Sequence, residues 1–344
     1  MSVKNRVLVY SSVKDIKEFN RQKFYVEDVA VLRSIGYEVV CTNAIMDFIS
    51  GSYDVAFLYF YKWSLFPALF AKGRGKRIFC TGGIDDLSPT ITPIGLKRNI
   101  YQILFLIIYF LSNKLNIVSS TDQVNVERVF GVKWLERRLK KFILFPHSVE
   151  LRELKTTQNK APHSFVTICW METKGNVVRK GLDLSFFFFA EYIKVYPQAL
   201  LQVIGKIGEG TRYLKSLKVY PRIKENIMFL GYVEDDVKFE ILNNSVFYLQ
   251  FSHYEGFGVA ALEANISRCY VLHSGSGGYL SSEEIWGKCI RFDAESPHMD
   301  DMNWIHQFSY EAEAWCFEDS FDASFEKYSR RNRALNWNKY MLNG

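Results

Sequence analysis

The chain lacks the usual features of zinc-binding, secreted and membrane-spanning proteins. Its six cysteines stand far apart, with no C-x-x-C pair and no histidine at zinc-finger spacing, which excludes a metal knuckle. The N-terminus MSVKNRVLVYSS carries charges within an apolar run too short for a signal peptide. Four cysteines lie in strand-like runs, where a free thiol packs as a small hydrophobe. We therefore expect a reduced, cytoplasmic chain.

Two further absences narrow the function. No G-x-G-x-x-G follows the first predicted strand, and GKIGEG over 205–210 has the wrong spacing, which argues against a dinucleotide-dependent oxidoreductase. Low-complexity tracts are also missing, and 48% hydrophobic with 23% charged residues is ordinary for a soluble globular protein. Disordered, collagen-like and polytopic membrane proteins are excluded by that composition.

The excess of positive over negative charge is confined to the first half of the chain. Residues 1–150 hold 21 Lys and Arg against 13 Asp and Glu, whereas residues 151–344 hold 22 against 24. Such asymmetry indicates either an acidic partner, nucleic acid or an anionic membrane, or a solvated basic face with no partner. Because no nucleic-acid-binding motif is present, we expect no nucleic acid partner.

A length of 344 residues predicts two domains by default and allows three. Short β-branched or aromatic runs alternate with helical patterns such as 24–35. The predicted strands are 6–12, 37–43, 55–60, 77–81, 116–120 and 142–146, then 164–170, 200–206, 226–233, 245–251, 270–275 and 289–293. Continuous apolar strands alternating with helices predict α/β domains with a buried parallel sheet. The fold class is therefore two doubly wound, Rossmann-like domains in tandem.

The domain boundaries follow from a polar stretch, RELKTTQNKAPH, which contains a proline and no periodicity. We place the N-terminal domain at 1–152, a linker at 153–163 and the C-terminal domain at 164–318. A C-terminal helix is expected over 319–344, and whether it crosses back to the N-terminal domain stays open.

The apolar run IYQILFLIIYFL over 100–111 is too short to span a bilayer, which needs about 20 residues. Basic residues bracket it at 97, 98 and 114, and basic clusters lie at 72–77 and 137–141. Two interpretations remain: a core helix buried on all sides, or a helix that lies in a membrane interface. The second would make 97–114 a contact with an anionic membrane surface.

The stretch HYEGFGVAALEANISRCYVLHSGSGG over 253–278 carries the clearest chemistry. A strand ends near Phe251 and a helix is expected from Val259, with Gly256 and Gly258 leaving its N-terminus open to an anion such as phosphate. Glu255 and Glu263 could bracket a ligand whose hydroxyls lie on either side of that phosphate, the layout of a sugar nucleotide. The alternative is that Glu255 caps the helix and Glu263 points at solvent.

A second element supports the first interpretation. Arg179, Lys180 and Gly181 stand between the strand 164–170 and a helix starting near Leu182. This places two cations at the carboxyl end of a strand, where ligands bind in doubly wound sheets.

Five ordered pieces then resemble the GT-B glycosyltransferases, specifically glycosyltransferase family 4. They are RKG (179–181), VIGKIG (203–208), FLGYV (229–233), EGFGVAALEA (255–264) and GGYLSSE (277–283). The resemblance covers most of the chain and is strongest over 165–290. It implies GT-B architecture and glycosyl transfer with retention at the anomeric carbon.

The resemblance also implies roles for individual residues. Lys180, with Arg179 or Lys174, would neutralise the diphosphate of the sugar donor. Glu255 would contact the transferred sugar, and Glu263 would hold the ribose. Phe257, Gly258 and Val259 would offer backbone N–H groups, and Tyr232 would lie beside the base. No metal or cofactor is implied, because the nucleotide sugar, carried by UDP, GDP or dTDP, is a substrate.

Departures from the family pattern lie mainly in the first half. The segment after the first strand has no glycine, and TGGIDD (81–86) replaces the usual histidine motif, so Asp85 or Asp86 would face the acceptor. Lys174 stands where an arginine is expected, a point charge in place of a bidentate fork.

Two hypotheses follow from these observations. The first is a glycosyltransferase on the inner face of the cytoplasmic membrane, acting on a lipid-linked or other saccharide acceptor in surface polysaccharide or glycolipid synthesis. The second is a non-catalytic GT-B protein that binds a membrane or a partner, which the departures motivate.

Overall fold

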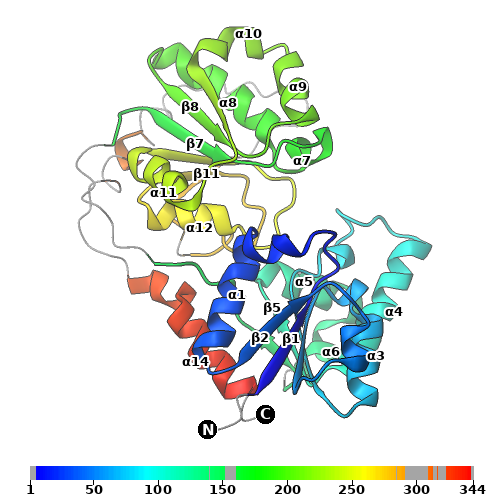
Figure 1. The fold of residues 1–344 in the computed structure, drawn as a ribbon. Coiled ribbons are helices and arrows are strands. Elements are labelled where there is room, and N and C mark those ends of the chain that lie inside the picture. Colours follow the sequence, from blue (N-terminus) through cyan, green and yellow to red (C-terminus); the bar gives the residue numbers. More distant parts are fainter. Residues whose placement is uncertain are drawn as a thin grey trace. The chain divides into compact units, whose positions relative to one another are not determined.

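The structure is a computed structural model that describes residues 5–138, 140–151, 160–283, 285–290, 309–312, 316 and 323–341. The chain divides into two compact units, residues 1–151 with 325–344 and residues 152–324. Figure 1 shows that each unit is built on a sheet covered by helices. The expected linker 153–163 and the expected boundary at 318 and 319 fall largely or wholly outside the described residues.

Unit 1 is built on a six-stranded parallel sheet. Its strand order is β2-β1-β3-β4-β5-β6, so the chain moves outward from β1 in both directions, as a doubly wound sheet requires. Each strand overlaps the run expected for it. The strands are β1 (Arg6–Tyr10), β2 (Glu38–Thr42), β3 (Val55–Tyr59), β4 (Arg77–Thr81), β5 (Lys114–Ile117) and β6 (Phe142–Leu144).

Helices cover both faces of this sheet because successive strand residues alternate between two cores. Leu8 and Leu58 belong to one core with Phe105 of α4, and Val9 and Phe57 belong to the other. The helices are η1 (Ile16–Asn20), α1 (Lys23–Ser34), α2 (Asp47–Ser50), η2 (Tyr61–Trp63), α3 (Leu65–Gly73), η3 (Asp85–Leu87), α4 (Leu96–Leu111), α5 (Ser120–Phe130) and α6 (Val132–Glu136).

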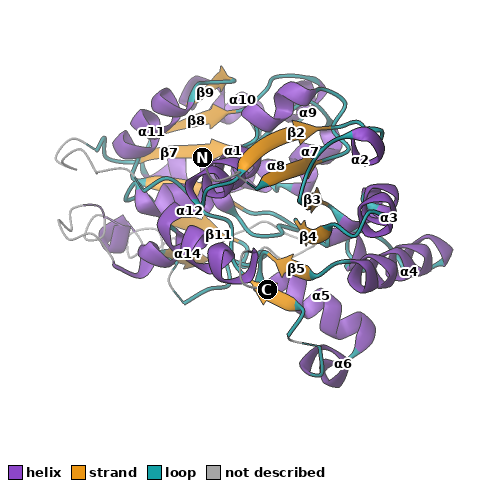
Figure 2. Ribbon diagram, turned by 60° about the horizontal axis from the view of Figure 1, so that its bottom comes forward, coloured by secondary structure: helices purple, strands orange, loops and turns teal. Residues whose placement is uncertain are grey.

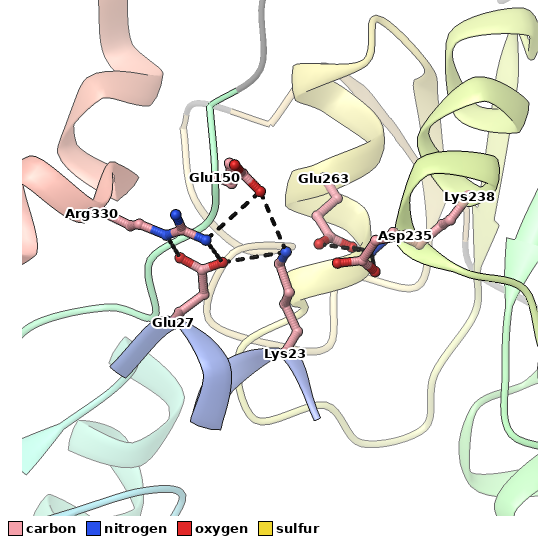
Figure 3. Close-up of polar contacts among 7 residues, drawn as sticks. All are labelled: Lys23, Glu27, Glu150, Asp235, Lys238, Glu263 and Arg330. Atoms are coloured by element: carbon pink, nitrogen blue, oxygen red, sulfur yellow. Dashed lines mark hydrogen bonds and ion pairs between the residues drawn. The ribbon is translucent and has the colours of Figure 1, made fainter. Parts of the chain in front are cut away.

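The C-terminal segment returns to unit 1 through η5 (Ala323–Tyr328) and α14 (Arg330–Met341). Arg330 pairs with both carboxylate oxygens of the fully buried Glu27 on α1 (Figure 3). Trp337 is fully buried, with its ring centroid 5.1 Å from that of Phe57 in β3. A charge pair with a buried carboxylate and a buried indole therefore fix α14 against α1 and the sheet.

The apolar run 100–111 lies in α4, which begins earlier, at Leu96. Phe105 and Ile108 are fully buried, whereas Ile103 is 57% exposed and Phe110 is 66% exposed. The interpretation of a helix buried on all sides is therefore wrong, because only one face of α4 packs on the sheet. Across the described residues, no helix is long and apolar enough to cross a membrane.

Unit 2 has a second six-stranded parallel sheet, with strand order β12-β11-β10-β7-β8-β9. Figure 2 shows its helices on both sides of the strands. The strands are β7 (Ser164–Ile168), β8 (Leu200–Ile204), β9 (Ile227–Gly231), β10 (Phe247–Gln250), β11 (Tyr270–His273) and β12 (Gly287–Cys289). The helices are α7 (Lys174–Arg179), α8 (Leu182–Val195), α9 (Glu209–Ser216), α10 (Tyr220–Ile223), η4 (Lys224–Asn226), α11 (Asp235–Asn244) and α12 (Val259–Ile266).

Two expectations for the edge of this sheet are corrected. The last strand, expected at 289–293, is β12 at Gly287–Cys289. A Cβ at Gly287 would lie 1.9 Å from the carbonyl oxygen of Val271, so a glycine permits the close approach that starts this strand. Cys289, expected to be buried, is exposed because β12 is the edge strand, whereas Cys80 and Cys169 are buried.

Candidate functional site

The strand order of unit 2 locates the candidate site. The chain leaves β7 toward β8 and β9 on one side, and toward β10, β11 and β12 on the other. β7 and β10 are parallel neighbours, with Phe165 opposite Phe247. The turns that follow them therefore meet at the topological switch point, where open α/β sheets bind ligands.

The basic and acidic residues expected at these two turns come together. The Lys180 ammonium, after β7, forms an ion pair with Oε2 of Glu255, after β10. The side-chain amide of Gln250 donates a hydrogen bond to the same oxygen at 3.1 Å. The Lys180 and Glu255 side chains are 27% and 14% exposed, so the pair is partly desolvated yet open to a ligand.

Main-chain contacts hold the two turns against each other. The amide of His253 donates to the carbonyl of Arg179 at 2.9 Å, and the Arg179 guanidinium donates to the carbonyl of Tyr254 at 3.4 Å. Gly181 has φ +62°, and a Cβ there would lie 1.8 Å from the carbonyl oxygen of Phe251. Only glycine fits this position, which sets the distance between the Lys180 turn and the end of β10.

The helix α12 begins directly beside this pair. Gly258 precedes it with φ +100°, in the left-handed region that favours glycine. By helix geometry, the first N–H groups of α12, beginning with Val259, have no carbonyl partner within the helix. Those N–H groups and the helix dipole favour an anion.

The G-G turn expected at 277–278 supports the loop that carries Glu255. The amide of Gly278 donates a hydrogen bond to the carbonyl of Gly256 at 3.2 Å. The amide of Tyr279 donates one to the carbonyl of Phe257 at 2.8 Å. A Cβ at Gly277 would lie 3.0 Å from the Cβ of Glu255, which brings the two backbones close. The Glu255 side chain is thus held by a loop that is itself hydrogen-bonded.

Glu263 lies inside α12 and is 3% exposed, which rules out the alternative that it points at solvent. Its two oxygens accept hydrogen bonds from the ammonium of Lys238 on α11, at 3.0 and 2.9 Å. Asp235 also pairs with Lys238, at 3.1 Å (Figure 3). Lys238 was not expected from the sequence, where the available signal was a lysine next to Phe239 on the buried side of α11.

Two other expected residues lie on different elements. Lys174 begins α7, and its ammonium lies 4.6 Å from the centre of the Tyr213 ring. Tyr232 follows β9 and is 59% exposed. The structure therefore groups Arg179, Lys180, Glu255 and the 256–259 loop, while Lys174 lies at the start of α7 and Tyr232 lies after β9.

The two acidic residues assigned to the acceptor side lie in unit 1, in η3 after β4. They line a pocket of about 350 Å³ with polar and aromatic walls, formed by Ser11, Ser12, Val13, Gln22, Tyr25, Phe60, Tyr61, Lys62, Trp63, Gly83, Asp85 and Asp86. Asp86 forms an ion pair with Lys62 at 2.8 Å. A lining of aromatic rings and charged groups suits the binding of a polar organic molecule.

Asp122, behind this pocket, was not expected from the sequence. Its carboxylate is buried and accepts a hydrogen bond from the backbone amide of Ile84 at 3.2 Å. Burial, followed by the charge of Asp85, raises the pKa of Asp122 well above its usual range. Burial therefore disfavours the charged form of the Asp122 carboxyl.

Comparison with known proteins links this arrangement to a family. Residues 174–287 match the family model described as glycosyl transferases group 1. That range contains the Lys180 turn, Glu255, Glu263 and the G-G turn. No curated protein matches the chain by sequence.

Solved structures agree on the fold. Anabaena Alr3699/HepE in complex with UDP-glucose has a TM-score of 0.68 at 12% identity, covering 98% of this chain and 100% of that one. The pneumococcal O-GlcNAc transferase GtfA, in complex with UDP and GlcNAc, has a TM-score of 0.58 at 16% identity, covering 84% and 56%. S. aureus TarM, in complex with fondaparinux, alpha-GlcNAc-glycerol and UDP, has a TM-score of 0.57 at 13% identity, covering 84% and 55%.

The chain spans a little over half the length of TarM and GtfA, and the full length of HepE. At these identities the likeness concerns the fold, while the family match concerns the part of unit 2 that carries the candidate site. Two parallel six-stranded α/β units of this kind are the GT-B fold, and residues 174–287 of this GT-B chain match the group 1 glycosyltransferases.

Proposed function

We propose that the chain is a retaining glycosyltransferase of family 4, which moves a sugar from a nucleoside-diphosphate donor to a saccharide acceptor. The observation that carries this proposal is the Lys180–Glu255 ion pair at the switch point of unit 2, beside the N-terminus of α12. The family match over the same residues supports it.

In this proposal the diphosphate binds at the N-terminus of α12. Charge develops on the diphosphate as its bond to the anomeric carbon breaks, and groups already aimed at that charge lower the barrier. Lys180 and Arg179 would supply cations, and the N–H groups from Phe257 to Val259 would donate hydrogen bonds. This set meets the charge of the leaving group without a metal ion, so we propose metal-independent transfer.

Glu255 and Glu263 divide the polar recognition. Glu255, partly exposed and held by Gln250, would accept hydrogen bonds from hydroxyls of the transferred sugar. Glu263 would hold the ribose, with Lys238 keeping the carboxylate charged and oriented in its buried position. Tyr232 and Lys174 would enclose the base and the outer phosphate as the ligand extends from the helix.

We further propose that the acceptor is a lipid-linked saccharide and that the protein works at the inner face of the cytoplasmic membrane. The pocket at Asp85 and Asp86 supports a polar acceptor, because carboxylates and aromatic rings together bind sugar hydroxyls and sugar faces. The basic first half, at 21 Lys and Arg against 13 Asp and Glu, supports an anionic lipid carrier.

A sugar-donor assay tests this function. The protein is incubated with UDP-, GDP- and dTDP-hexoses, with and without a chelator, and hydrolysis is followed as release of the nucleoside diphosphate while water takes the sugar at the anomeric carbon. We expect release from one nucleotide class, unchanged by the chelator, with the product anomer matching that of the sugar donor by NMR. An inverted product would contradict retention, and release from no donor would favour the non-catalytic hypothesis.

A further inference from the structure

An apolar surface lies on the outward side of two helices in unit 1. We propose that this surface binds the headgroup region of an anionic lipid membrane. The α3–α4 surface, as we name it, consists of large apolar residues exposed on both helices: Phe66, Leu69 and Phe70 on α3, and Leu96, Ile100, Ile103 and Phe110 on α4.

The spacing of these residues places them on one side of each helix. On α4 the exposed apolar residues are separated by four, three and seven positions, and on α3 by three positions and one. This spacing aligns them in a stripe along one side of each helix. Other positions face the sheet, including Ala68 and Ala71 on α3 and Phe105 on α4. An ordinary surface helix turns its charged side to solvent, whereas these two helices turn a second apolar side outward.

The two stripes are neighbours. α3 packs against α4, and Figures 1 and 2 both show the two helices side by side at one edge of unit 1. Leu96 is 78% exposed, Phe110 is 66% exposed and Phe66 is 58% exposed, although each is large and apolar. Several such residues over two adjacent helices form a patch of the kind that marks an interaction site.

Charge around the patch decides which partner fits it. Residues 55–121 contain eight Lys and Arg but only two acidic residues, Asp85 and Asp86, and neither α3 nor α4 contains an acidic residue. Asp86 is already paired with Lys62. The region is thus almost purely basic, which complements anionic headgroups.

Individual lysines lie at the margins of the apolar stripe. Lys97, in the first turn of α4, has its ammonium 5.8 Å from the centre of the Tyr101 ring. At the other end of α4, the Lys141 ammonium donates to the carbonyl of Phe110 at 3.2 Å. Burial, and then the charge of Lys72, lower the pKa of Lys141.

This combination favours a lipid surface over a second copy of the chain. Two copies would bring like-charged lysines together, whereas a membrane interface accepts apolar side chains to a depth of about 5–10 Å while its headgroups meet the lysines. A helix of 16 residues has room to lie along the interface. The proposal is independent of glycosyl transfer, since binding requires neither a sugar donor nor an acceptor.

The test is flotation of the full chain with vesicles of phosphatidylcholine alone or mixed equally with phosphatidylglycerol. We expect binding to the mixed vesicles and little binding to the neutral ones. The combined changes Ile100→Ser, Ile103→Ser and Phe110→Ser should lower partitioning by about tenfold for each residue. A matched control, Leu200→Ser with Met228→Ser and Leu335→Ser, alters apolar residues that are also exposed, and it should bind normally.

A second pair of variants tests membrane binding if the serine variant does not fold. Lys72→Gln with Lys97→Gln should weaken binding to mixed vesicles by about fivefold for each lysine, and Lys218→Gln with Lys224→Gln should not. Equal binding to both vesicle types, or no binding to either, would overturn the proposal. A third outcome would also overturn the proposal: the wild-type protein binds no vesicles but forms a dimer, and the serine changes abolish that dimer. The α3–α4 surface would then join two copies of the chain.

Discussion

Lys180→Met and Glu255→Gln should each lower kcat by about 10²- to 10³-fold with the nucleotide sugar that the donor assay identifies, while the protein stays folded. Lys180 would lose its charge beside the departing diphosphate, and Glu255 would lose its charge beside the transferred sugar. These interactions strengthen as the bond breaks, so the loss should fall on kcat more than on KM. Initial rates at saturating sugar donor provide the measurement.

The matched control is another lysine–glutamate ion pair of unit 2. Lys194 pairs with Glu191 on α8, three residues apart in the sequence. Lys194→Met and Glu191→Gln should leave kcat within about twofold of wild type, since a pair near the surface contributes little. If the control variants lost as much activity as Lys180→Met, the switch-point pair would have no special role.

Gly181→Ala should destabilise the protein by about 2–5 kcal/mol and remove activity as well. The added Cβ would stand 1.8 Å from the carbonyl oxygen of Phe251, so the Lys180 turn and the end of β10 must separate. The cost combines overpacking, at about 1–3 kcal/mol or more, with left-handed strain of about 1–2 kcal/mol. Urea unfolding followed by circular dichroism gives the free-energy change.

Gly75→Ala isolates the strain from the clash. Gly75 has φ +66°, close to the +62° of Gly181, but a Cβ there meets nothing within 4 Å. We expect Gly75→Ala to cost about 1 kcal/mol and to leave activity unchanged. Equal destabilisation by the two substitutions would mean that the contact with Phe251 does not hold the site together.

Much of the fold could be predicted from the sequence because strands buried on both faces are continuous apolar runs. VAFLYF and RIFCT, for example, become β3 and β4 with almost no shift in their boundaries. The predicted range of β12 was shifted because this edge strand buries few side chains and so has a weak apolar pattern. It also begins with Gly287, a residue that permits close approach to Val271 but is untypical of strands. The six-residue α7 was not predicted. Its N-cap, Thr173, is a residue type typical of helix starts, and its hydroxyl accepts a hydrogen bond from the amide of Asn176 at 3.2 Å.

The candidate site likewise contains residues that could be placed from the sequence and residues that could not. Lys180 and Glu255 could be placed together because each lies on the connection between a strand and the helix that starts near Leu182 or at Val259, and parallel strands end at one edge of the sheet. The short helix α7 within the first connection does not change this placement. Lys238 and Asp122 could not be placed, since their contacts join helix to helix or helix to loop. A lysine beside Phe239 marks Lys238 locally, but nothing local identifies its partner Glu263. The sequence likewise showed that 100–111 is apolar, but which of its residues face outward depends on how α4 packs.

The most direct test of the central claim is a calorimetric titration of UDP, GDP and dTDP into the wild-type protein and into Lys180→Met. If unit 2 binds a nucleotide sugar at the Lys180–Glu255 pair, one of these nucleotides binds the wild-type protein, and Lys180→Met binds it at least about tenfold more weakly. If none of them binds, or if the bound one has the same affinity for both proteins, the diphosphate site is not at this pair.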